Sequence, residues 1–124
     1  MFEYLVYYEY KSLTPWSKEI RIETDGEKLR YRLKETGYES NGEVSDGLYE
    51  GDVEAFINKL ESFHIEQWPL EFFKPVLDGF GWSLRYKEVG KPCRKIKGSN
   101  AYPDCFKDFL DLLITVPSKD GGKQ

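Results

Sequence analysis

The residues that usually carry nucleophilic or metal chemistry are scarce in this chain. Its one histidine is His64, and its two cysteines, Cys93 and Cys105, do not form a CxxC pair. His64 has no set of partners at ligand spacing, which makes a poor metal site. Cys105 falls in the first turn of a predicted helix, where the helix dipole lowers a thiol pKa. An enzyme centred on Cys105 is therefore the one catalytic hypothesis, and the structural alternative is that Cys105 packs beside Phe109 as a small apolar group.

Known catalytic motifs are not found in the sequence. It contains no glycine-rich phosphate loop, no GxSxG turn and no HExxH helix. Carboxylates are plentiful, but none is marked out by an apolar pocket that would tune its pKa. We therefore expect no catalytic residue, no metal and no cofactor, and we interpret the chain as a non-catalytic binding domain.

Acidic residues are concentrated in one stretch. Between residues 35 and 58 the chain holds seven acids and neither lysine nor arginine. An acidic surface of this kind steers the approach of a basic partner. Aromatic side chains outside regular elements add anchors to such an interface when they are exposed. We therefore predict a site for a basic protein partner that uses Glu35, Glu39, Glu43, Asp46, Glu50, Trp68 and Phe72.

Basic residues are concentrated in a second stretch. Between residues 85 and 97 there are six bases and a single acid. The alternative hypothesis is a nucleic-acid-binding module in which phosphate contacts Arg85, Lys87, Arg94, Lys95, Lys97 and Asn100. The net charge of −4 disfavours such binding by the whole surface, and the outward-facing residues of this hairpin lack interleaved aromatic side chains for base stacking. Both charge runs are also compatible with solvated faces that serve solubility.

Alternating side chains predict five strands. Residues 2–10 alternate with period two and are rich in aromatic residues, which indicates a strand that is covered on both faces or central in its sheet. Residues 18–24 and 28–34 form a hairpin around Asp25-Gly26, residue types that favour a two-residue turn. This turn places Ile22 opposite Leu29. Residues 82–88 and 93–98 form a second hairpin, in which a three-residue turn places Tyr86 opposite Arg94 and Leu84 opposite Ile96.

Residues 35–51 separate the first hairpin from a helix. They are rich in glycine and have little hydrophobic periodicity, which predicts a long loop or a further irregular strand. Asp52 then precedes an apolar stripe at helical spacing that ends near His64, and a second stripe follows Pro103. The predicted fold is α+β, a mainly antiparallel five-stranded sheet with two helices packed on one face, in the order β-β-β-α-β-β-α.

Composition places these elements in one domain. The chain has 124 residues, of which 40% are hydrophobic and 16% aromatic, and this suits a single core built on rings. We expect residues 1–117 to form the domain and residues 118–124 to be a disordered tail. The sequence shows no signal peptide and no membrane span, and its two cysteines fit free thiols in a reducing compartment, although a bridge between them is geometrically possible. We therefore expect a cytoplasmic protein without membrane association, and the oligomeric state stays open.

The C-terminal third carries a resemblance. Its pattern is Asp78-Gly79 and Trp82-Ser83-Leu84, followed by Gly98-Ser99-Asn100-Ala101-Tyr102-Pro103. This resembles a widespread group of small uncharacterised bacterial proteins, mostly from Firmicutes, with a DG-x-x-W-x-L strand and a G-x-N-x-Y-P turn before the final helix. Similar proteins are sometimes taken for immunity or antitoxin-type partners, but the resemblance assigns no activity and no catalytic residue. Because catalytic residues are missing and acid is concentrated in one stretch, we predict a non-catalytic protein-binding domain of immunity-protein or inhibitor type.

Overall fold

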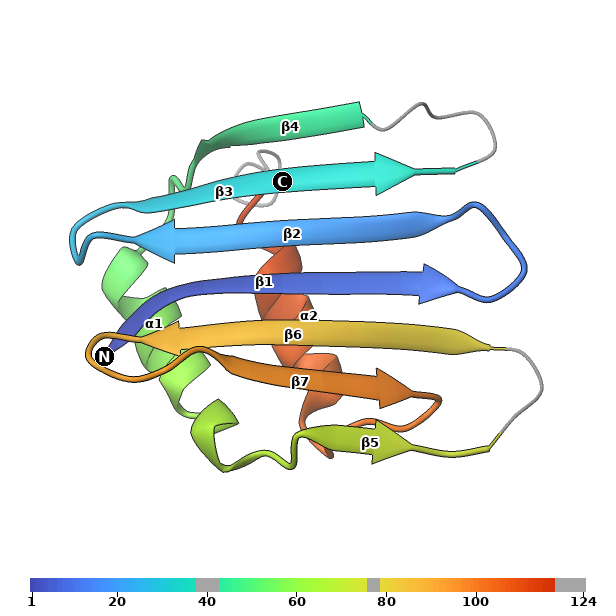
Figure 1. The fold of residues 1–124 in the computed structure, drawn as a ribbon. Coiled ribbons are helices and arrows are strands. Elements are labelled where there is room, and N and C mark those ends of the chain that lie inside the picture. The colour runs from blue at the N-terminus through green and yellow to red at the C-terminus, as the bar shows by residue number, and fades with distance from the viewer. Residues whose placement is uncertain (38–42, 76–78, 118–124) are drawn as a thin grey trace.

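The sheet is built around strand β1 (Phe2–Lys11), which lies at its centre (Figure 1). The computed structural model describes residues 1–37, 43–75 and 79–117. Within them seven strands join in the order β4-β3-β2-β1-β6-β7-β5. Neighbouring strands are antiparallel, except that β5 and β7 run parallel. Of the two arrangements predicted for residues 2–10, the central strand is the one observed.

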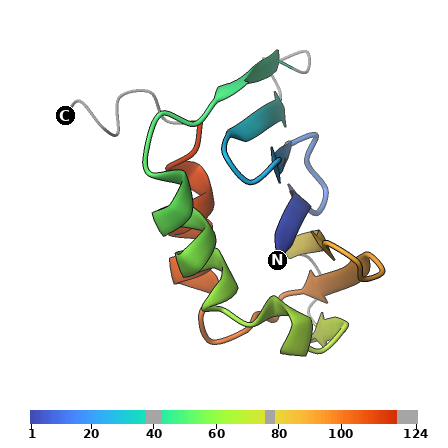
Figure 2. The same cartoon turned by 90° about the vertical axis from the view of Figure 1, so that its left-hand side faces the viewer.

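The remaining elements follow in chain order. The strands are β2 (Ser17–Thr24), β3 (Leu29–Thr36), β4 (Glu43–Leu48), β5 (Glu71–Phe73), β6 (Phe80–Glu88) and β7 (Arg94–Ser99). The helices are α1 (Val53–Glu61) and α2 (Phe106–Ile114), with a short 3-10 helix, η1 (Ile65–Gln67), after α1. Both α-helices cover the same face of the sheet (Figure 2). The predicted α+β class is confirmed, but the predicted five-stranded sheet is wrong, since the sheet is mixed and has seven strands.

The two additional strands lack the alternation that identifies a strand in sequence. β4 is an edge strand that pairs with β3 alone, and its Val44 and Leu48 side chains are exposed. With no apolar face to bury, this segment shows no period-two pattern. β5 has only three residues, which is too short for a pattern to emerge.

The hairpin of β2 and β3 has a longer turn than predicted. Thr24 pairs with Leu29, so that four residues connect the strands instead of two. The Asp25 carboxylate accepts hydrogen bonds of 2.9 Å from the backbone N–H groups of Glu27 and Lys28. These bonds stabilise the longer loop, because they satisfy donors that a tight turn would leave to solvent. The register moves by two residues, so Ile22 faces Tyr31 and still points to the core.

The hairpin of β6 and β7 has the predicted register. Tyr86 pairs with Arg94, and Leu84 pairs with Ile96. Leu84 and Ile96 are both buried on the face toward the helices, so burial of one apolar face is sufficient to define this register.

The helices begin close to their predicted starts. Asp52 caps α1, since its carboxylate accepts a hydrogen bond of 3.0 Å from the backbone N–H of Ala55. The helix ends at Glu61, before His64, which has a left-handed φ of 52°. α2 begins after Pro103, whose carbonyl accepts a hydrogen bond from the Phe106 N–H at 3.0 Å. The two helices bury Phe56, Ile57 and Leu60 from α1 and Phe106, Phe109 and Leu113 from α2.

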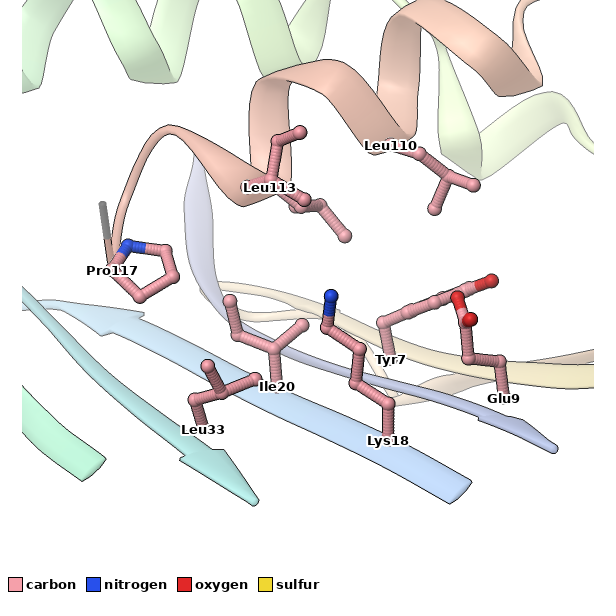
Figure 3. Close-up of a pocket in the computed structure, with 9 residues that line it drawn as sticks. Tyr7, Glu9, Lys18, Ile20, Leu33, Leu110, Leu113 and Pro117 are labelled. Carbon is pink, nitrogen blue, oxygen red and sulfur yellow. The ribbon is translucent and has the colours of Figure 1, made fainter. Parts of the chain in front are cut away.

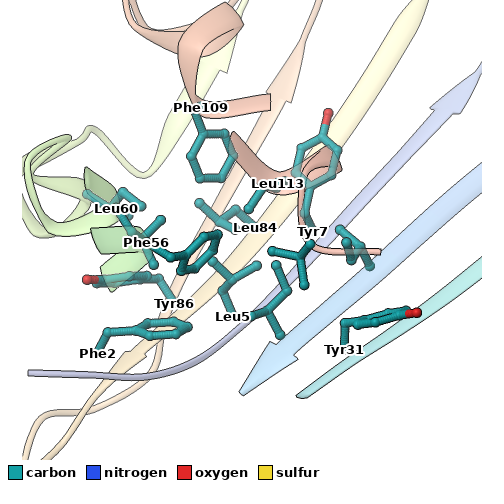
Figure 4. Packing of buried hydrophobic residues seen from close by; sticks show 14 of the residues in the cluster. Phe2, Leu5, Tyr7, Tyr31, Phe56, Leu60, Leu84, Tyr86, Phe109 and Leu113 are labelled. Atoms are coloured by element: carbon teal, nitrogen blue, oxygen red, sulfur yellow. The ribbon is translucent and has the colours of Figure 1, made fainter. Parts of the chain in front are cut away.

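Aromatic rings fill the space between the helices and the sheet (Figure 4). The Phe109 ring is fully buried, and its centroid lies 5.4 to 6.3 Å from the rings of Tyr7, Phe63, Trp68 and Phe106. On β6, Trp82 is buried, and its Nε1 donates a hydrogen bond of 3.0 Å to the Ala101 carbonyl. This core fixes the helices to one side of the sheet.

No helix among the described residues is long and apolar enough to cross a membrane. The predicted tail at residues 118–124 and Asp78 of the predicted Asp78-Gly79 turn lie outside the described residues.

Candidate functional site

The helices leave one face of the sheet uncovered (Figures 1 and 2). Strand side chains alternate between the two faces, so the register assigns each one to a side. Leu5 and Tyr7 of β1 are buried beneath the helices, whereas Tyr4, Val6 and Tyr8 lie on the opposite side. We call this helix-free side the open face. It faces the viewer in Figure 1.

A row of cations crosses the open face at the middle of the strands. Val6 of β1 pairs with Arg21 of β2 and with Arg85 of β6. Arg21 pairs in turn with Arg32 of β3, and Arg85 pairs with Lys95 of β7. Since neighbouring strands lie about 4.8 Å apart, these residues span about 19 Å over five strands. We call Arg32, Arg21, Arg85 and Lys95 the basic row.

The basic row contains two like-charge cross-strand pairs. Arg21 faces Arg32, and Arg85 faces Lys95, an arrangement that destabilises a sheet. Arg21 has an acidic neighbour on its own strand, a Glu23 carboxylate oxygen 3.8 Å away, and Arg32 faces Asp46 of β4. Among the described residues, no ion pair within 4 Å joins Arg32, Arg85 or Lys95 to an acid. Cations toward the rim of the face are paired instead, since Lys97 lies 3.4 Å from a Glu71 carboxylate oxygen. The repulsion is therefore concentrated in the row, where a bound anion would relieve it.

A shallow hollow lies at the β2–β4 end of the basic row. It has a volume of about 350 Å³, and Arg21, Arg30 and Arg32 line it together with Glu23 and Asp46. Arginine matches the geometry of phosphate and carboxylate oxygens through paired N–H donors. The hollow thus brings three such donors to one end of the row.

Tyrosine rings of β1 flank the row on both sides. Tyr4 and Tyr8 are the open-face residues that precede and follow Val6, and both are half-buried. The Arg21 guanidinium carbon lies 4.9 Å from the centroid of the Tyr4 ring, and the Tyr8 and Tyr10 ring centroids are 5.9 Å apart. At the other edge, Phe73 of β5 is 67% exposed. These rings provide flat surfaces beside the cations, on which a base can stack.

The open face is more basic than the molecule as a whole. Eight bases lie on it, from β2, β3, β6 and β7: Arg21, Arg30, Arg32, Lys34, Arg85, Lys87, Lys95 and Lys97. The acids on this face are fewer: Glu19, Glu23, Asp46, Glu71 and Glu3, the last of which lies 3.4 Å from the Lys87 ammonium. The chain carries a net charge of −4. Acidic charge is therefore carried largely by loops and by the helix side.

The predicted acidic site is divided between different parts of the surface. Asp46 lies on the open face opposite Arg32, whereas the register places Glu35 on the side of the sheet that faces the helices. Glu50 is exposed in the loop before α1. Glu39 and the side chain of Glu43 lie outside the described part of the chain. The described acids therefore do not form one continuous patch.

The two aromatic residues predicted for the acidic site belong to the core. Trp68 is only 6% exposed, and its Nε1 donates a hydrogen bond of 3.0 Å to the Phe63 carbonyl. Phe72 is half-buried, with its ring centroid 5.7 Å from that of Trp82. Trp68 would anchor a partner only if it were exposed, and it is not, because η1 and the chain before β5 fold it against Phe109 of α2. The exposed aromatic of β5 is Phe73, since alternation turns Phe72 inward.

Four of the six residues in the alternative site lie on the open face. Arg85, Lys87, Lys95 and Lys97 share this side of the β6–β7 hairpin. The other two residues make hydrogen bonds within the fold and are not part of the basic row. Arg94 is half-buried on the helix side, where its guanidinium donates to the Trp68 carbonyl. The Asn100 side-chain oxygen accepts a hydrogen bond of 3.0 Å from the Phe80 N–H and so fixes the end of β6.

Both cysteines are free thiols. Cys105 is the residue that precedes α2, and burial raises the pKa of its thiol, with further contributions from Asp108 and Asp104. This direction is opposite to the expected one, because burial and the nearby carboxylates outweigh the backbone hydrogen bond that lowers the pKa. His64 is exposed, and its Nδ1 lies 3.3 Å from a Glu66 carboxylate oxygen. Across residues 1–37, 43–75 and 79–117, no cluster of three or more His, Cys, Asp or Glu side chains is arranged to hold a metal.

Comparison with known proteins finds no matching family model, no matching curated protein and no matching solved structure. We therefore infer a function from the geometry and charge of the chain itself.

Proposed function

We propose that this domain is a non-catalytic module that binds single-stranded nucleic acid on its open face. The basic row carries the proposal. Its four cations repel one another in the free protein, and phosphates placed along the row would replace repulsion by attraction. A strand bound along the row would cross β3, β2, β1, β6 and β7 in turn.

The tyrosines favour a single strand over a duplex. In a duplex the base faces are stacked on one another, so they are not accessible to protein rings. In a single strand the bases are free to stack on aromatic side chains, and every base has such a face. Tyr4 and Tyr8 lie immediately beside the row, within reach of bases whose phosphates contact Arg21 and Arg85. The expected binding is tolerant of sequence and sensitive to salt.

Fluorescence anisotropy with labelled oligo(dT) and oligo(U) at low salt tests the proposal. The double variant R85E/K95E reverses half of the basic row, and we expect it to weaken binding by about tenfold or more. The matched control is K59E/K107E, which makes the same charge change at two exposed lysines of α1 and α2. The two double variants are compared at about 0.1 M salt, where long-range charge is screened within about 10 Å, and there we expect the control to change binding by about twofold or less.

Three outcomes would contradict the proposal. One is that the unaltered protein fails to bind either oligomer at low salt. Another is that both double variants weaken binding equally, which would indicate a general charge effect. A third is that a duplex of the same length binds more tightly than the single strand.

A protein partner at the β4 edge is the second candidate, and it keeps the immunity-protein or inhibitor type of function. The observation that favours it is that β4 pairs with β3 alone, so one backbone edge of the sheet is left for an added strand, beside exposed Val44 and Leu48. Asp46 and Glu50 add negative charge there. Charge reversal at Glu39, Glu43 and Asp46 tests this candidate: it should abolish recovery of a basic partner in a pull-down, and unchanged recovery would count against it.

The two free thiols support a reducing compartment, and we place the proposed activity in the cytoplasm, where nucleic acid is available.

A further inference from the structure

A second hollow lies on the helix side of the sheet, opposite the open face. It is a cavity of about 430 Å³ between α2 and the strands β1, β2 and β3 (Figure 3). Cavities of about 300 to 1,000 Å³ are typical of small-molecule sites. It therefore has the size of a binding pocket, and it is separate from the proposed nucleic-acid surface.

The walls of the cavity are apolar and come from both layers. Ile20 and Leu33 form the sheet side, whereas Leu110, Leu113 and Ile114 form the helix side. Leu33 and Leu110 are only half-buried, and Ile114 is 51% exposed. The sheet and the helix thus present apolar side chains to each other across a gap that neither fills.

A buried hydroxyl lies beside one of the charged groups of the cavity. The Tyr7 side chain is 2% exposed, and its hydroxyl makes no hydrogen bond of regular geometry within the described part of the chain. Burial, followed by the charge and the side-chain contact of the neighbouring Glu9 carboxylate, raises the pKa of Tyr7. The hydroxyl therefore stays protonated beside Glu9.

Two opposite charges stand at the same end of the cavity. Glu9 of β1 and Lys18 of β2 are register partners, and both line the cavity. Figure 3 shows the ammonium and the carboxylate pointing from the sheet toward α2. No ion pair within 4 Å joins them to each other or to another described residue. A ligand head group that carries both charges would pair with each of them.

We propose that this cavity binds a small amphipathic zwitterion, such as a free apolar α-amino acid. Its carboxylate would accept from the Lys18 ammonium, and its ammonium would donate to Glu9. Its apolar side chain would fill the space between Leu33, Leu110 and Leu113. The charge pair selects against a simple fatty acid, whose carboxylate would lie near Glu9 with no ammonium to pair with that residue. It also selects against a simple amine, whose ammonium would lie near Lys18 with no carboxylate to pair with that residue.

Three probes with the same indole body and different heads test this proposal. They are tryptophan, a zwitterion, indolepropionate, an anion, and tryptamine, a cation. Titration of the ¹⁵N-labelled protein at millimolar probe should give saturable amide shifts near Ile20, Leu33 and Leu113. We expect tryptophan to bind about tenfold more tightly than either of the others, since each charge-assisted hydrogen bond is worth about that factor or more.

Two variants at the half-buried charges make the test specific. E9Q should remove the preference for tryptophan over indolepropionate, and K18M should remove the preference for tryptophan over tryptamine. Thermal melting checks that both variants stay folded. The proposal is overturned if no probe shifts these amides, if the ranking is unchanged in both variants, or if the shifts map to the open face. It is also overturned if the unliganded protein forms a dimer that closes the cavity.

Discussion

At the level of single residues, the proposed nucleic-acid site depends on cations that face one another across neighbouring strands. Arg85 opposite Lys95 and Arg21 opposite Arg32 are cross-strand pairs that a sheet under selection for stability alone would exchange for opposite charges. Arg21 and Arg32 each have an acid nearby, Glu23 and Asp46, whereas no ion pair within 4 Å joins Arg85 or Lys95 to a described acid. A local arrangement that costs stability is expected where a ligand binds. Stability and binding should therefore respond in opposite directions when one of these charges is reversed.

R85E is the single change that separates the two properties. It converts the Arg85–Lys95 pair into an opposite-charge pair, and we expect the free energy of unfolding to rise by about 0.2 to 1 kcal/mol. Oligonucleotide binding should weaken in the same variant. Urea unfolding measures the first effect, with R85Q as the control that removes repulsion without adding attraction. A fall in stability in R85E would contradict the role assigned to the row.

Y8A tests the stacking surface. Loss of the Tyr8 ring should weaken binding of a single strand by about 1 to 3 kcal/mol, because stacking of a base on an aromatic ring contributes about that amount. Y8F is the matched control, since it keeps the ring and removes only the hydroxyl. Anisotropy titrations of both variants decide the point. Equal binding by Y8A and the unaltered protein would exclude a stacking role for Tyr8.

At the level of secondary-structure elements, the sequence pattern predicts the helices and strands that must bury an apolar face. Both helices and the β6–β7 register could be predicted because each has an apolar face that must be covered. The β2–β3 turn was predicted with the wrong length, since Asp25 forms backbone hydrogen bonds that residue types alone do not reveal. β4 and β5 were not predicted as defined strands, because an exposed edge strand and a three-residue strand carry no apolar period.

The Asp25 loop makes a prediction about pH. Hydrogen bonds from the backbone N–H of Lys28, and then of Glu27, hold the pKa of the Asp25 carboxyl below its usual value. A carboxyl with a lowered pKa in the folded state stabilises the fold above its unfolded pKa, and this stabilisation is lost as the pH falls through the folded pKa.

D25N removes the ionisable group from this loop. We expect the unaltered protein to melt at a higher temperature than D25N at neutral pH, and the two melting temperatures to converge in acid. Thermal melts from neutral pH to about pH 2 measure this difference. Parallel pH profiles for the two proteins would show that the loop hydrogen bonds contribute nothing.

At the scale of the whole molecule, strand order decides which residues form a site. Arg85, Lys87, Lys95 and Lys97 could be predicted from sequence, because they lie close together in one hairpin. Arg21, Arg32 and the tyrosines of β1 could not, since their approach depends on β1 lying between β2 and β6. The acidic stretch appeared as one patch in sequence, whereas the fold divides Asp46 and Glu35 between opposite faces.

The number of cations in the basic row predicts how nucleic-acid binding depends on salt concentration. If the four cations of the basic row each contact one phosphate, the slope of log K against log salt should be about −2.8 for a single strand. R85E/K95E should reduce the magnitude of this slope by about 1.4. Anisotropy titrations at several salt concentrations measure both values. A slope near zero for the unaltered protein would show that phosphate contacts do not drive binding.

The most direct test of nucleic-acid binding on the open face is an ¹H–¹⁵N correlation titration of the protein with oligo(dT) at low salt. We expect saturable shifts along the middle of β1, β2, β6 and β7, including the amides of Arg21, Arg85 and Lys95. These shifts should be lost in R85E/K95E. Shifts confined to α1 and α2, or no shifts at all, would contradict binding on the open face.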